Sequence, residues 1–561
     1  MTKTKSKNTS KKVTSKKNIK KDNFKEKLVT LKDCFITKCK SLTLKNYINI
    51  GIVLFILITS YLVFFQYKVI PFVDGQVYYR LSLIINGSFP ISKWDIARGF
   101  SFPLIISGIT KLFGDSQHGL LTGFYMFYLF LIFSIGYFIQ KYIKQNNVKN
   151  RVSYIIMYLL LIVFNPLIIG WSHTLLVESV IPAIYMIVIM ILYKWYRVNL
   201  KERKRQEIIF GVVLALLGMF IWFLKQPYAP AYFAGLFIAS ILSAIYFKSK
   251  KVLWQKLLTC LCCLVFMIIS IFVWNDFISS YTSQSANDKN NDYISGSVTA
   301  GLNVYYYPIN QKVFCTNKYV KNLDKNDQKQ IERIKSKYGK KWCDHTDIYE
   351  IRKKNSKLID VEILVHKGKS ASIIENLKFV VKNMFKHPNY VFGSYLHNYL
   401  AIVDIEDVDL INGYSSSARI NPNTVGENLS NGFYTYYSNN PIMHEPEEFT
   451  KHLNGTTTSN SEAITNLLLI NNSLCLYLFK LLLLCCLPIF IYTFVKFVKT
   501  KENYYFLITV ISFMCFINII FNVFMGAVID RYIYAFYPLM ILCMFILFME
   551  KNKISGDGNE K

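Results

Sequence analysis

The chain repeats uncharged, nearly continuous apolar stretches of about 20 residues, and this pattern limits its possible folds more than any other feature. A helix of ~20 apolar residues can cross a bilayer, whereas soluble domains bury shorter and more periodic segments. The 561 residues are 52% hydrophobic and have a mean hydropathy of +0.27. Disordered, collagenous and disulfide-scaffold proteins do not have this composition. The sequence therefore predicts a polytopic membrane protein.

Scanning for uncharged apolar runs predicts ten spans. A further apolar run at residues 101–112 is too short to cross, and we expect it to be interfacial or re-entrant. The predicted fold is an all-α membrane bundle of about ten transmembrane helices, with a mixed α/β or α-rich extracytoplasmic domain between spans seven and eight. The predicted spans are residues 47–67, 119–140, 152–170, 175–193, 208–224, 228–247, 252–274, 467–495, 504–524 and 532–549.

The net charge of +30, from 65 Lys and Arg against 35 Asp and Glu, is distributed unevenly among the connections. The tail before the first span carries +12, and together with alternate connections between spans it accounts for +26 of the total. Lys and Arg mark cytoplasmic loops. We therefore expect a multi-pass plasma-membrane protein with both termini in the cytoplasm and the large loop outside.

These boundaries divide the chain into five parts: a basic, disordered cytoplasmic tail (1–46), a transmembrane module (47–274) with its first outer loop at 68–118, an extracytoplasmic domain (275–466), C-terminal spans (467–549) and a cytoplasmic tail (550–561). The first tail either sets topology alone or also attaches to anionic lipid. No aromatic or groove-reading element accompanies its Lys run, so we expect no nucleic-acid partner.

The extracytoplasmic domain offers two features that could bind or cross-link. Cys315 and Cys343 are the only cysteines in it, and they could form a disulfide in an oxidising compartment. The acidic residues of 404–409 could bind Ca²⁺ or form a solvated surface. The sequence leaves both alternatives open.

Several ionisable residues lie in or beside the spans, and the predicted topology places all of them near the outer membrane face. Such residues usually face a cavity, a partner or a transport path. Two carboxylates among several cations are the set expected around a phosphorylated substrate at a membrane surface. They are Asp74, Arg98, His173, Glu178, Lys225 and Arg531, the last followed by Tyr532.

Each of these residues also has a structural interpretation. Arg98, Lys225 or Arg531 could extend to the interface without binding a ligand. Glu178 could pair with His173 or Lys225, and Asp74 could cap a following helix.

The motifs around these residues resemble those of the GT-C superfamily of polytopic glycosyltransferases, which contains the protein O-mannosyltransferases and the lipid A aminoarabinose transferase. The similar segments are DGQVYY at 74–79, NG at 86–87, RGFSFPL at 98–104, LFG at 112–114, LLVES at 175–179, KQP at 225–227, DRY at 530–532 and YPL at 537–539. Two positions depart from the family pattern: Gly75 stands where many members have Glu, and Val177 where Thr is usual.

This resemblance implies transfer of a sugar from a polyprenyl-phosphate donor to a hydroxyl on a cell-surface glycan, lipid or protein. Asp74 would be the general base, and Arg98, Lys225 and Arg531, with His173 as a further candidate, would bind the phosphate. Tyr78, Tyr79 and Tyr532 would contact the sugar, and Glu178 would orient a cation or the acceptor. Family members differ in metal use, so no cofactor is implied, although a divalent cation remains possible.

Three other functions remain as alternatives. A surface-polysaccharide polymerase or ligase would use the long outer loop for its chemistry. A transporter or flippase for lipid-linked sugars predicts polar residues deep in several spans and a repeat between the two halves. A binding module with a membrane anchor would not need ten spans.

Overall fold

The structure is a computed structural model, and it describes residues 44–66, 69, 75–95, 98–146, 148–198, 200–282, 462–524 and 530–552, with isolated positions at 325, 328, 329, 332 and 385. Within these residues it is helical and contains no β-strand. Almost all of the extracytoplasmic domain predicted at 275–466 therefore lies outside the described residues, as do Cys315, Cys343 and the acidic run. Their predicted features stay predictions.

The helices follow one another with short connections in both described halves of the chain. In order, they are α2 (Leu44–Phe64), α3 (Gly75–Ile85), η1 (Ile91–Lys93), α4 (Ser101–Phe113), α5 (Gln117–Asn146), α6 (Arg151–Tyr158), η2 (Leu159–Val163), α7 (Pro166–Ser172), η3 (Val177–Ser179), α8 (Ile181–Trp195), α9 (Leu200–Leu224), η4 (Gln226–Tyr228), α10 (Ala229–Phe247), α11 (Lys250–Tyr281), α24 (Glu462–Thr500), α25 (Asn503–Phe524), α26 (Asp530–Tyr534) and α27 (Tyr537–Lys551).

Eight helical segments in the described part of the chain are long and apolar enough to cross a membrane. Each overlaps one of the ten predicted spans, and the other two predicted spans correspond to shorter apolar helices at Ile50–Phe64 and Ile181–Trp195. Many apolar side chains on α11 face outward, with Trp254 71% and Phe272 61% exposed. An exposed apolar surface of this kind, on a helix long enough to cross a bilayer, is typical of contact with lipid. The chain is a multi-pass helical membrane protein.

The helix expected at 175–193 begins later than the sequence predicts. Residues Val177–Ser179 form a 3-10 turn, and α8 starts at Ile181 with Pro182 in its first turn. Its 15 residues span ~22 Å, less than the ~30 Å hydrocarbon core. Residues 175–180 are also mostly apolar and are buried, but they are not α-helical. Their 3-10 turn contains Glu178 and holds it just before α8.

The predicted span at 152–170 is interrupted in its middle. The π-helical segment η2 follows α6, and α7 starts anew with Pro166 and with Asn165 as its N-cap. The Asn165 side chain accepts hydrogen bonds from the backbone amides of Leu167 and Ile168 at 3.0 and 3.3 Å. From α24, Asn471 Nδ2 donates to the carbonyls of residues 160 and 164 at 2.8 and 3.0 Å. These bonds satisfy backbone groups that a bilayer offers no water to bind.

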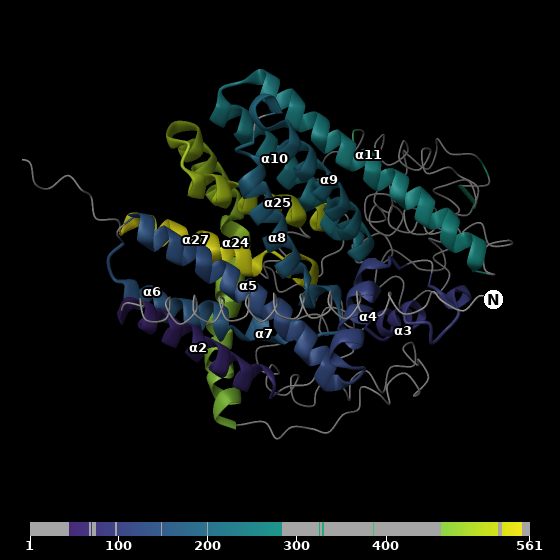
Figure 1. Cartoon of the computed structure of the whole chain (residues 1–561), viewed down its shortest axis with the longest axis horizontal. Helices are drawn as coiled ribbons and strands as arrows, with labels where there is room; N and C mark the ends of the chain where they lie inside the picture. Colours follow the sequence, from purple (N-terminus) through teal and green to yellow (C-terminus); the bar gives the residue numbers. More distant parts are fainter. Residues whose placement is uncertain are drawn as a thin grey trace, which may run out of the picture. The chain divides into compact units, whose positions relative to one another are not determined.

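The helices of residues 64–561 pack as a bundle in which neighbours in space are often distant in sequence. α25 packs against α10 and α24, α5 packs against α8 and α27, and α9 packs against α10 and α11 (Figure 1). The first loop is also helical: α3 packs on α4, and α4 packs on both α5 and α9. The prediction of a short apolar, non-spanning segment at 101–112 agrees with α4, whose 13 residues are too few to cross.

Candidate functional site

A buried ion pair joins the start of α8 to the end of α9. Lys225 Nζ lies 2.9 Å from Glu178 Oε1, and the two side chains are 8% and 0% exposed. The 3-10 turn η3 holds Glu178 immediately before α8, and Lys225 is the residue between α9 and η4. The sequence left open whether Glu178 pairs with His173 or with Lys225, and the pairing with Lys225 is confirmed.

Two tyrosines complete the surroundings of this ion pair. Tyr228, at the end of η4, donates its hydroxyl to Glu178 Oε1 at 3.2 Å. The ring of Tyr532 lies under Lys225, with Nζ 4.4 Å from the ring centroid, and stands edge-on to the Tyr228 ring. Asn518 of α25 donates to the carbonyl of Tyr532 at 2.8 Å and so fixes α26 beside η3.

The cluster of Glu178, Lys225, Tyr228 and Tyr532 is arranged to hold an ammonium group in a dry environment. Burying two charges costs several kcal/mol per ion, and a close partner with additional hydrogen bonds offsets part of this cost. The Tyr532 ring attracts the ammonium through its π face, which is worth more when water is excluded. An ammonium group has three donors. A lysine held in this way keeps its positive charge at a fixed place in the fold.

Two glycines bring the first loop against this cluster. A Cβ atom on Gly75 would lie 2.8 Å from the carbonyl oxygen of Leu175, three residues before Glu178. A Cβ atom on Gly99 would overlap the backbone of Phe223, two residues before Lys225. These close backbone approaches require residues without side chains. Any residue larger than glycine at position 75 would therefore have to displace the backbone of Leu175.

Arg98 lies in the loop between η1 and α4 and is half-buried. Its guanidinium carbon is 5.6 Å from the centroid of the Tyr78 ring, and its Nε is 3.7 Å from Asp95. The Trp94 indole donates to the Arg98 carbonyl at 3.1 Å. Arg98 and Tyr78, both predicted site residues, are thus in contact. Gly99, directly after Arg98, lies against the Phe223 backbone near the end of α9.

Aromatic packing holds the same loop in place. The Phe100 ring packs at a tilt against Phe223 of α9 and Trp274 of α11, with ring centroids 4.7 and 4.8 Å apart. Trp94 packs edge-on to Trp274 at 5.4 Å. Aromatic pairs at these distances stabilise beyond the apolar area that they bury. The loop that carries Arg98 is therefore fixed to two membrane helices.

Tyr79 is held by a carboxylate at the end of the first loop. It is 1% exposed, and its hydroxyl donates to Asp115 Oδ1 at 2.6 Å. Burial and the Asp115 carboxylate raise the pKa of the Tyr79 phenol, so the hydroxyl stays protonated and remains a donor. If the Tyr79 hydroxyl bonds a sugar, it must first give up its hydrogen bond to Asp115.

His173 is fully buried and is held by backbone rather than by the ion pair. Its Nδ1 lies 2.7 Å from the Ile169 carbonyl, and its Nε2 lies 2.8 Å from the Phe64 carbonyl. Burial lowers the pKa of His173, although both carbonyl contacts favour the protonated ring and act in the opposite direction. A phosphate-binding role would require one of these two contacts to break.

For two predicted site residues the structure describes no side-chain position. Asp74 lies outside the described residues, although Gly75 directly after it begins α3. Arg531 lies within α26, and its side chain is outside the described part. Among the described residues, no three His, Cys, Asp or Glu side chains come together to hold a metal ion.

Sequence reasoning did not single out three partners of the predicted residues. Asp95 precedes Arg98 by three residues, so this short separation was a usable signal, whereas Tyr228 bonds Glu178 across 50 residues and offered none. Asp115 had no such signal, because 36 residues separate it from Tyr79.

Comparison with known proteins adds no assignment: no protein-family model, curated protein or solved structure matches this chain.

Proposed function

We propose that this protein is a membrane glycosyltransferase that moves a sugar from a polyprenyl-phosphate donor to a hydroxyl of a cell-surface glycan, lipid or protein. The observation that carries the proposal is the buried Glu178–Lys225 pair with Tyr532 against the Lys225 ammonium. Three chain segments that the sequence associated with a phosphorylated substrate meet there. The GT-C-like motifs supply the reaction class.

In this mechanism, Asp74 takes the proton of the acceptor hydroxyl as its oxygen attacks the anomeric carbon. The bond between that carbon and the phosphate oxygen breaks, and the polyprenyl phosphate leaves as an anion. Lys225 and Arg98 stabilise the developing negative charge, Lys225 as a point charge and Arg98 as a planar fork. Arg531, in the same helix as Tyr532, is the third proposed cation.

Glu178 has a positioning role in this proposal. It fixes the Lys225 ammonium at 2.9 Å and partly balances its charge before donor binds. Tyr78 supports Arg98 in the same way through its ring. Cations held in advance need no reorganisation when the leaving group develops charge.

The test is a transfer assay with the purified full chain, a panel of polyprenyl-phosphate hexoses and membrane or cell-wall acceptors. Asp74→Asn removes the proposed base while preserving size, and we expect transfer to fall by about 10²–10⁴-fold. Asp557→Asn makes the same chemical change outside the motifs and serves as the control.

Full activity of Asp74→Asn would refute the base assignment. If no hexose donor supports transfer by the wild-type chain while a lipid-linked oligosaccharide is polymerised or ligated, the polymerase alternative replaces this proposal. Movement of a lipid-linked sugar between leaflets without bond formation would instead indicate a flippase.

A further inference from the structure

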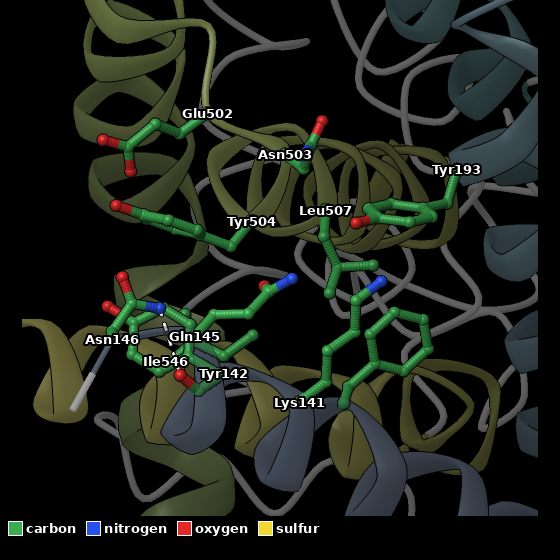
Figure 2. A pocket seen from close by; sticks show the side chains of 11 residues that line it. Lys141, Tyr142, Gln145, Asn146, Tyr193, Glu502, Asn503, Tyr504, Leu507 and Ile546 are labelled. Carbon is green, nitrogen blue, oxygen red and sulfur yellow. Dashed lines mark hydrogen bonds between the residues drawn. The ribbon is translucent and has the colours of Figure 1, made fainter. Parts of the chain in front are cut away.

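A polar cavity lies at the end of α8 opposite the Glu178–Lys225 pair. Glu178 precedes the first turn of α8, whereas Tyr193, in the last turn of that helix, lines this cavity. The cavity has a volume of about 390 Å³, within the range of small-molecule sites. It is formed by the end of α5, the start of α25 and Ile546 of α27 (Figure 2).

The lining is polar and carries charges of both signs. Lys141 and Gln145 extend from α5 toward Tyr504 and Leu507 of α25, and Glu502 lies on the α25 side (Figure 2). The Oε2 atom of Glu502 is buried, and no donor among the described residues reaches it. A buried acceptor without a donor is uncommon in proteins, and this one is available to the donor of a bound group.

Two cations meet at one ring beside this cavity. Lys141 Nζ and Arg197 Cζ lie 5.1 and 4.8 Å from the centroid of Tyr193. Within the described ranges, neither cation forms an ion pair with a carboxylate. Like charges sharing one ring favour an anionic ligand between or beside them.

An apolar surface leads from the lipid to this cavity. On α5, Met126, Phe130 and Tyr137 are 54%, 36% and 58% exposed. At 100° per residue, these three side chains and Lys141 fall within an arc of ~60° on one side of the helix. An exposed apolar stripe that ends at a cation matches a molecule with hydrocarbon chains and an anionic headgroup.

We propose that the cavity binds the headgroup of a membrane glycerophospholipid, with Lys141 on its phosphate and the acyl chains along the exposed side of α5. Glu502 accepts a hydrogen bond from the hydroxyl or ammonium group of the headgroup. Lipid headgroups lie at the depth of helix ends, where Lys and Tyr concentrate in membrane proteins. The binding does not depend on the transfer activity proposed above.

Native mass spectrometry of the delipidated full chain in detergent tests this assignment. The probes are phosphatidylglycerol, phosphatidylethanolamine, diacylglycerol and soluble glycerol 3-phosphate. We expect both phospholipids to bind, and diacylglycerol to bind at least about tenfold more weakly because it has no phosphate for Lys141.

Lys141→Ala is expected to weaken phospholipid binding about tenfold. Lys144→Ala removes the same charge from an exposed position on α5 outside the lining, and it is expected to bind like wild type.

A second variant keeps every charge. Gln145→Trp places a large side chain in the cavity from an exposed position, and it is expected to displace the lipid while the protein stays monodisperse. Equal lipid binding by Lys141→Ala, Gln145→Trp and Lys144→Ala would overturn the proposal. It would also be overturned if glycerol 3-phosphate bound as tightly as the phospholipids, because the site would then serve a soluble phosphate.

Discussion

Lys225 and Glu178 lie 47 residues apart in the chain and 2.9 Å apart in the fold, with Tyr228 on the carboxylate and Tyr532 under the ammonium. This pair fixes the entry of α8 to the exit of α9. It gives the protein a cation held before any ligand arrives. The stability of the fold and the proposed donor binding would therefore depend on the same two side chains, and the two effects can be separated experimentally.

The separation uses single and double substitutions of the pair. Glu178→Leu leaves the Lys225 charge buried without its carboxylate, and we expect a loss of about 3–5 kcal/mol in stability. The double variant Glu178→Leu with Lys225→Met removes both charges and is expected to recover most of that loss while sugar transfer stays low. Detergent melting temperatures and the transfer assay measure the two effects. Recovery of both in the double variant would show that the pair is only structural.

Gly99 should not tolerate even a methyl group. Because a Cβ atom there would overlap the Phe223 backbone, Gly99→Ala must displace the loop that carries Arg98, and we expect a loss of about 1–3 kcal/mol. Gly108→Ala is the matched control, since open space surrounds that position in α4 and alanine favours the helix by up to ~1 kcal/mol. Melting temperatures of the two variants should shift in opposite directions. A Gly99→Ala protein as stable as wild type would contradict the close approach.

His173 should make stability depend on pH. Its pKa is lowered in the fold, so the folded state binds fewer protons than the unfolded state, whose imidazole titrates near ~6.5. The stabilisation is therefore present above that pH and is lost as the pH falls. We expect the wild-type melting temperature to drop between pH 7.5 and 5.5, and the drop to be smaller in His173→Gln.

The exposed His118 provides the control for this pH dependence. His118→Gln should retain the full drop between the two pH values. If His173→Gln and wild type lose the same number of degrees, titration of His173 does not contribute.

Asn471 should be needed for the interrupted helix. Asn471→Leu removes the donor that serves one carbonyl within η2 and one directly after it, and we expect a loss of about 1–3 kcal/mol in stability. Thr259→Val is a suitable comparison, because among the described residues the Thr259 hydroxyl bonds only the Gln255 carbonyl of its own helix. Its melting temperature should stay within a few degrees of wild type. Equal effects of the two substitutions would argue against a special role for Asn471.

The positions of the spans were predictable, because a helix that crosses the hydrocarbon core needs a long uninterrupted apolar stretch, and such stretches can be read from the sequence. The start of α8 was not, because residues 175–180 are as apolar as the helix after them, and a buried turn satisfies the same pattern. The sequence named Lys225 as one of two possible partners of Glu178, because few charged residues lie near the spans.

The basic connections show a different limit of sequence reasoning. Lys256 lies in one of the connections that the charge count assigned to the cytoplasm, yet it is buried, and its ammonium bonds Glu207 at 2.6 Å and the Trp195 carbonyl at 3.0 Å. A charge count treats Lys256 and an exposed lysine alike. Burial depends on tertiary packing of α9 against α11, which no local pattern records.

The interruption at Asn165 has a consequence for biosynthesis. Asn471, which serves the carbonyl of Leu160, is 311 residues further along the chain, and Tyr537, which contacts Asn165, is 372 residues beyond it. A nascent chain that ends after α11 lacks both partners, and the bilayer offers no water in their place. The early helices must therefore be inserted first, and they can reach their final packing only after the rest of the chain has been translated. An N-terminal fragment made alone should be degraded or retained by the insertion machinery.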